Sequence, residues 1–220
     1  MTDQIIDQFI NWLDTTNAWK LFFETLSKYN IRFKGYPAFE MSDYFKIIDR
    51  VEPNSHYVFL SVDTKSLSAK AIEDSVKNAE GVSYFTHAGI VFLNGDRNTS
   101  VMQVRDTGFV EQPLLDLLKS VDYFCVVKLP ILEGKEDLID SRIQDFRNRT
   151  SSIQYDWQMQ LDNDPNLIYC SELVYDVFKD TVDNPNFKPR VMMGRDVFDP
   201  DILLGCGEII YCNHPDLKNI

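Results

Sequence analysis

The central part of the chain carries short apolar runs that are bounded by turn residues. Runs of this kind, rich in β-branched and aromatic residues, predict β-strands. The strands are expected at residues 57–62, 87–93, 100–105, 123–129 and 207–211. Asn94-Gly95 lies between the second and third runs and is typical of a tight hairpin turn, so we expect these two strands to pair in an antiparallel manner.

Apolar residues with helical spacing occur mainly on either side of these strands. They predict two helices, or one broken helix, within residues 3–29, with a wide aromatic face. Other helices are expected at residues 66–78, 113–119 and 135–150, from residue 170 onward, and as a helical turn at 199–204. Residues 151–168 and the segment around Met192 are expected to be loops. Helices that flank a run of antiparallel strands indicate an α+β fold.

Composition narrows the classes of protein that the chain can represent. Its 220 residues, 44% of them hydrophobic, are enough for one globular domain with a substantial core. The net charge of −12 disfavours phosphate backbones, so we expect no nucleic-acid partner. The apolar runs are too short for a transmembrane segment, and Met1-Thr2-Asp3-Gln4 does not resemble a signal peptide. We therefore expect a cytoplasmic protein by default, with secretion by a non-classical route left open.

Cys170 stands where a turn-rich loop gives way to a helix. Residues 162–166 precede it, and Leu173, Val174, Val177 and Phe178 form the apolar face of that helix. The unpaired N–H groups and the positive end of the dipole at a helix start favour a thiolate over a thiol. Cys170 is therefore a candidate nucleophile. The alternative is a small buried apolar residue, which is commoner for a lone cysteine.

A nucleophilic thiol needs a base, and His87 is the histidine best placed to supply one. It opens a predicted strand directly after the loop at residues 81–86, whereas His56 and His214 lie in loops. Taken alone, His87 is more simply structural, but the pair formed with Cys170 is typical of thiol enzymes. Three histidines and four scattered cysteines without a CxxC pair show no zinc-site spacing, so we expect no metal, no cofactor and thiols that stay reduced.

Four segments together carry a resemblance to a known family. Phe85-Thr86-His87-Ala88-Gly89-Ile90-Val91, Val101-Met102-Gln103-Val104, Tyr155-Asp156 and Tyr169-Cys170-Ser171-Glu172-Leu173-Val174 resemble the circularly permuted papain-fold hydrolases of the YiiX-like branch. These enzymes belong to the NlpC-type superfamily of thiol peptidases and amidases. In ordinary papain-like enzymes the cysteine helix precedes the histidine strand, and permutation reverses that order, as here.

The resemblance covers about residues 57–211. It implies a permuted papain-like α+β fold, in which the nucleophile helix packs on an antiparallel sheet. Residues 1–50 are then expected to form an N-terminal helical extension, and residues 51–220 the catalytic domain.

The resemblance also implies roles for individual residues. Cys170 would be the nucleophile and His87 the general base and acid. The family usually carries a carboxylate in the strand after the histidine, where this chain has Gln103, and an amide oxygen can still orient the imidazole. Glu111 is a candidate substitute for the carboxylate, and Gln103 is otherwise an ordinary solvent-facing strand residue. Tyr155 would assist the oxyanion hole, or else only pack beneath the loop.

These roles describe a thiol hydrolase that forms an acyl-enzyme on Cys170. Its substrate would be an amide- or ester-containing small molecule, peptide or lipid. Two alternatives stay open: a thiol acyltransferase acting on lipid-type acyl groups, and a weak or inactive papain-like binding or effector module, which Gln103 and the aromatic N-terminal segment would suit. A redox role for Cys170 ranks below these, because no resolving cysteine is evident in the sequence.

Overall fold

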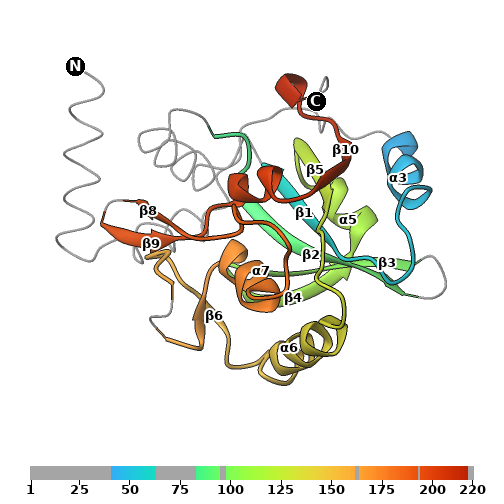
Figure 1. The fold of residues 1–220 in the computed structure, drawn as a ribbon. Coiled ribbons are helices and arrows are strands. Elements are labelled where there is room, and N and C mark those ends of the chain that lie inside the picture. Colours follow the sequence, from blue (N-terminus) through green and yellow to red (C-terminus); the bar gives the residue numbers. More distant parts are fainter. Residues whose placement is uncertain (1–40, 63–82, 95–97, 162–163, 193, 218–220) are drawn as a thin grey trace, which may run out of the picture.

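A six-stranded sheet lies at the centre of the computed structural model, which describes residues 41–62, 83–94, 98–161, 164–192 and 194–217 (Figure 1). Its strand order is β10-β5-β1-β2-β3-β4, and all neighbouring strands are antiparallel. The strands are β1 (Tyr57–Val62), β2 (His87–Asn94), β3 (Asn98–Arg105), β4 (Gly108–Pro113), β5 (Tyr123–Lys128) and β10 (Glu208–Cys212). A mixed structure around a mostly antiparallel sheet fits the α+β expectation.

Five of these strands coincide with the predicted runs, and β2 and β3 pair as expected, with Val91 opposite Val101. The sixth strand, β4, was not predicted. Its second half, Glu111-Gln112-Pro113, is polar and ends in proline, which suits an edge strand but does not resemble a core strand. Gly108 opens β4 with a φ of +94°, and a side chain there would collide with the carbonyl oxygen of Ile153.

The helices are α3 (Met41–Ile48), α5 (Leu114–Leu118), α6 (Glu136–Asn148) and α7 (Cys170–Phe178), with 3-10 turns η1 (Pro200–Gly205) and η2 (Pro215–Leu217). The predicted helices at 113–119, at 135–150 and from residue 170, and the turn at 199–204, are therefore confirmed. The predicted helices at 3–29 and 66–78 lie outside the described residues. The α3 segment lies next to β10, where Arg50 Nη1 donates to Ile210 O at 2.6 Å. The division into an extension and a catalytic domain at residue 50 stays a prediction.

The sheet is buried on both faces. Alternate residues of β1 point to opposite sides, and all six of its residues are buried. One side packs with α7 and α6, which lie side by side in Figure 1, and includes Leu60, Ala88, Ile90, Cys125 and Leu173. The other side packs with α3 and α5 and includes Ile47, Phe59, Val101, Leu114 and Phe124.

Two short strand pairs lie in segments that were expected to be loops. β6 (Gln154–Tyr155) runs parallel to β7 (Leu167–Ile168), and β8 (Arg190–Met192) is antiparallel to β9 (Arg195–Val197). Strands of two or three residues are too short to show a period of two, so the sequence pattern does not reveal them.

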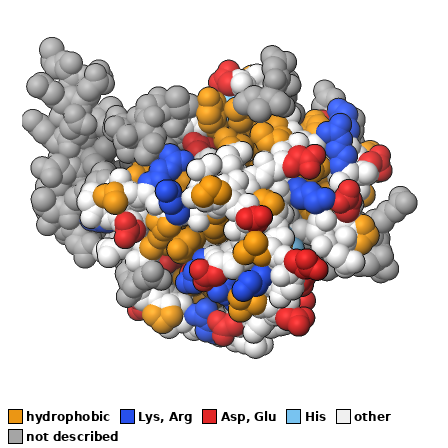
Figure 2. Space-filling view, in the orientation of Figure 1, with side chains coloured by type: hydrophobic (Ala, Val, Ile, Leu, Met, Phe, Trp, Pro, Cys, Tyr) orange, Lys and Arg blue, Asp and Glu red, His pale blue; other side chains and the backbone are white. Residues whose placement is uncertain are grey.

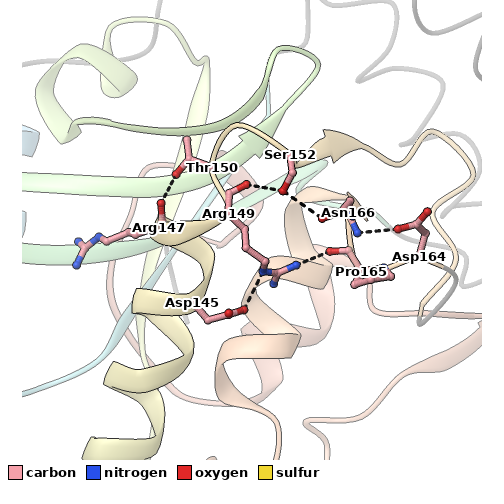
Figure 3. Close-up of polar contacts among 8 residues, drawn as sticks. All are labelled: Asp145, Arg147, Arg149, Thr150, Ser152, Asp164, Pro165 and Asn166. Atoms are coloured by element: carbon pink, nitrogen blue, oxygen red, sulfur yellow. Dashed lines mark hydrogen bonds and ion pairs between the residues drawn. The ribbon is translucent and has the colours of Figure 1, made fainter.

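A polar cluster ties the turn before β7 to the end of α6 (Figure 3). Arg149 Nη1 donates to Pro165 O at 2.7 Å, while Arg149 Nε donates to Asp145 at 2.8 Å. The Ser152 hydroxyl lies 2.9 Å from Arg149 O and 3.2 Å from the side-chain oxygen of Asn166. These contacts fix the chain a few residues before Cys170.

Acidic and basic side chains lie next to one another over the face that carries α6 and α7 (Figure 2). Within the described ranges, no helix is both long and apolar enough to cross a membrane.

Candidate active site

Cys170 is the first residue of α7, and the backbone around it is held by two buried side chains. Tyr169 precedes the helix in an extended conformation, and its N–H donates to the Glu172 carboxylate at 3.3 Å. The Tyr169 hydroxyl accepts from Phe198 N at 2.9 Å. Glu172 therefore serves the helix start, because a carboxylate here satisfies an N–H near the positive helix end.

The other end of α7 is held by α6. Arg142 donates through Nη1 to Val177 O at 3.1 Å and also to Lys179 O. The last carbonyl groups of a helix have no partner within the helix, so a cation that donates to them satisfies both the hydrogen bonds and the negative dipole end.

Replacing Arg142 with methionine should lower the free energy of unfolding by about 1–2 kcal/mol, because partly buried carbonyl groups lose a charged donor. Urea unfolding followed by circular dichroism measures this change. Arg147→Met is the matched control on the same helix, since Arg147 binds Glu111 through a partly exposed ion pair and should contribute less than about 1 kcal/mol. Equal losses in the two variants would contradict the role given to Arg142.

Polar groups surround the Cys170 sulfur although the residue is only 3% exposed. The Tyr155 hydroxyl donates toward Sγ at 3.9 Å, and Sγ lies 4.0 Å from Thr86 O. The backbone N–H of Ala88 and the side chain of His87 also hydrogen-bond to the sulfur. This is not the apolar setting expected of a cysteine that only fills a core.

These contacts decide the protonation of Cys170. Burial raises the pKa of the Cys170 thiol, because a thiolate is poorly solvated in the interior. The charge and hydrogen bond of His87, with the donors from Ala88 and Tyr155, outweigh burial and lower that pKa below its ordinary value. The site therefore favours the thiolate form of Cys170 over the thiol.

His87 is held by Gln103. His87 Nε2 lies 2.5 Å from Gln103 Oε1, and since that oxygen only accepts, Nε2 carries the proton. The other ring nitrogen is then left to face the thiol. Gly89 makes this contact possible: a Cβ at that position would lie 2.7 Å from the Val101 side chain and 3.3 Å from Gln103 Cβ.

Gln103 is fully buried, so its interpretation as a solvent-facing strand residue is wrong. It lies on β3, an inner strand of the sheet between β2 and β4 that also contacts α7, and this position accounts for the burial. Its amide nitrogen has no hydrogen-bond partner among the described residues. A carboxylate at this position would have no such unsatisfied donor.

Glu111 does not take the place of the missing carboxylate. It lies on β4 rather than in a loop, where it accepts from Ser100 Oγ at 2.9 Å and from two nitrogens of Arg147 at 3.1 Å. The structure thus brings together all four predicted site residues, Cys170, His87, Gln103 and Tyr155, and directs Glu111 to Arg147.

Tyr155 remains a neutral donor. Burial raises the pKa of its hydroxyl, and the negative charge of Cys170 raises it further. The ring packs against Trp157, with ring centroids 4.5 Å apart. The hydroxyl is therefore a neutral donor beside Sγ.

Asp201 is a residue near the site that the sequence analysis missed. It lies in η1 and accepts from the backbone N–H groups of Tyr84 at 2.8 Å and Phe85 at 2.9 Å, directly before His87. The helix-start pattern Asp199-Pro200-Asp201 predicts a turn, and Asp199 does cap it by accepting from Asp201 N. No local pattern could have indicated the partner segment before β2, in which Tyr84 lies 117 residues away in sequence.

In the part of the chain that the structure describes, no group of three or more His, Cys, Asp or Glu side chains is arranged to hold a metal ion. His56 packs against Phe178, and Cys206 donates to Ile202 O at 3.1 Å.

Comparison with known proteins gives one match. The family model described as "Permuted papain-like amidase enzyme, YaeF/YiiX, C92 family" matches residues 58–212, which is well over half of the chain. No curated protein and no solved structure matches the chain.

Proposed function

The chain belongs to the permuted papain-like amidase family, and from this membership we propose that it cleaves amide bonds with Cys170 as nucleophile and His87 as base and acid. The observation that carries the proposal is the environment of Cys170. A thiol that is 3% exposed has a lowered pKa because His87 pairs with it. Structural cysteines in apolar surroundings show the opposite shift.

The first half of the reaction uses the charged pair. The Cys170 thiolate attacks the amide carbon, and the carbonyl oxygen becomes an oxyanion. The Cys170 N–H and the Tyr155 hydroxyl would donate to that oxygen, as preorganised donors do in acyl transfer. The imidazolium of His87 then gives its proton to the leaving amine, the C–N bond breaks, and a thioester to Cys170 remains.

The second half returns the enzyme to its starting state. Neutral His87 takes a proton from water, and the resulting hydroxide attacks the thioester. The C–S bond breaks, the acid product leaves, and Cys170 is again a thiolate beside an imidazolium. Throughout, Gln103 would hold Nε2 and so keep the second ring nitrogen directed at the sulfur. Family membership favours small-molecule or peptide amides as substrates, and the same thioester would form from an ester.

The pH dependence of iodoacetamide labelling at Cys170, read by peptide mass spectrometry, tests this proposal. We expect labelling well below the ordinary thiol range, because the pKa of Cys170 is lowered. Cys206 is an internal control, since burial raises its pKa to about 11. A Cys170 labelling curve with the midpoint of an ordinary thiol would overturn the proposal.

A further inference from the structure

We propose that Cys125 and Cys212 form a reversible disulfide, a redox-modification site separate from Cys170. The two residues are direct partners across neighbouring strands, Cys125 on β5 and Cys212 on the edge strand β10. Both are thiols in this structure, and their side chains are hydrogen-bonded to each other.

The strand register puts the pair in a suitable geometry. In the next pair along, Asn213 N donates to Phe124 O at 3.1 Å, and Phe124 N donates to the Asn213 side chain at 2.6 Å. Antiparallel pairs alternate, so Cys125 and Cys212 form the non-hydrogen-bonded pair, in which the Cα atoms approach to about 4.5 Å. Disulfides span Cα separations of about 4.4–6.8 Å, so the bond can form with little movement of the backbone.

Exposure gives the two thiols different roles. Cys125 is fully buried, whereas Cys212 is partly exposed on the sheet edge. The hydrogen bond to Cys212, together with burial, raises the pKa of the Cys125 thiol, so Cys212 is the thiol that meets an oxidant first. Cys170 lies too far away to react with this pair. Its neighbour Ala88 is on β2, and β1 lies between β2 and β5, so two strand spacings, or about 10 Å, separate Ala88 from β5.

The proposed oxidant is glutathione disulfide, which accepts the two electrons that the two thiols lose. The Cys212 thiolate attacks one glutathione sulfur, the glutathione S–S bond breaks, and one glutathione thiolate leaves. Cys125 then loses its proton and attacks the Cys212 sulfur, which expels the second glutathione thiolate. The two protein thiols lose two electrons and two protons, and one glutathione disulfide becomes two glutathione molecules.

The bond would fix the edge strand that adjoins the segment before His87. Asp201, ahead of β10, binds the N–H groups of Tyr84 and Phe85. His214, just after β10, packs on the Phe85 ring with centroids 5.6 Å apart. A cross-link between β10 and β5 also closes a long loop that contains α6 and α7, which restricts the unfolded chain and stabilises the folded one.

The test is a titration of the full chain with mixtures of reduced and oxidised glutathione, followed by acid quenching and a non-reducing peptide map. We expect a Cys125–Cys212 linked peptide that dithiothreitol removes, with a higher Tm in the oxidised protein. Cys212→Ser should abolish both effects, whereas Cys206→Ser should keep them. The same titration of Cys170→Ala should give the same linked peptide, so the result does not depend on the proposed function.

Three outcomes would overturn the proposal. One is a stable mixed disulfide between Cys212 and glutathione that Cys125 does not resolve. Another is a linked peptide that joins Cys170 or Cys206 instead of this pair. The third is an unchanged pair of thiols at the highest proportion of oxidised glutathione.

Discussion

Replacing His87 with alanine should slow iodoacetamide labelling of Cys170 at pH 5.5 by about 10- to 100-fold. An ordinary thiol with a pKa of about 8.5 is thiolate in only about one molecule in a thousand at this pH. Without His87, burial acts on Cys170 with less opposition and raises its pKa further. The more basic thiolate is intrinsically more nucleophilic, which offsets part of this loss of thiolate.

The matched control is His56→Ala, which removes a histidine that packs on Phe178 at the far end of α7. It should leave labelling of Cys170 nearly unchanged, so a loss restricted to His87→Ala cannot come from general loosening of the helix. Coincident labelling curves for the wild type and His87→Ala would exclude a thiolate–imidazolium pair. The chain would then be better described as a papain-like binding module.

The wild type should gain about 2 kcal/mol of stability relative to Asp201→Asn as the pH falls from 7 to 4. Burial is the main cause that raises the pKa of Asp201 to about 6, with a further contribution from Asp199. The N–H groups of Tyr84 and Phe85 oppose this rise, and Arg190 opposes it more weakly. The native state therefore binds a proton more tightly than the unfolded chain, whose aspartate has a pKa of about 3.9.

The sign of this effect follows from linkage. Between about pH 4 and pH 6 the native state carries more protons at Asp201 than the unfolded state, so acidification favours folding, and the contribution is lost as the pH rises through 6. Asparagine does not titrate, so the difference between the two proteins isolates this group from the other carboxylates. Urea unfolding at several pH values measures it, and a difference that stays constant from pH 4 to 7 would contradict the assignment.

The elements around the site were predictable where the chain gives a local signal. The strand from His87 and the helix from Cys170 can be recognised in the sequence, because their apolar residues follow a clear pattern and turn residues bound each segment. The pairing of Cys170 with His87 could be anticipated from residue chemistry and from the family resemblance. The structure adds the contacts that bring these distant segments together.

Other features depend on contacts that no local pattern encodes. β4 has a polar second half that ends in proline, so its strand character comes from pairing with β3. The environment of Gln103 could not be read from the sequence, because alternation along β3 does not show that the residue faces an interior. Asp201 and Arg142 act on backbone groups of segments far away in the chain, and their roles appear only when the fold is complete.

The position of α7 along the chain has a consequence for biosynthesis. All described strands of the sheet except β10 precede α7, so a ribosome makes the histidine strand well before the cysteine helix. Thr86 and Cys170 are 84 residues apart, and at about 5–20 residues per second that interval lasts roughly 4–17 s. During it, Leu60, Ala88 and Ile90 lack the helix that covers them in the finished fold. A nascent chain of this order cannot bring Cys170 next to His87 until α7 has been made.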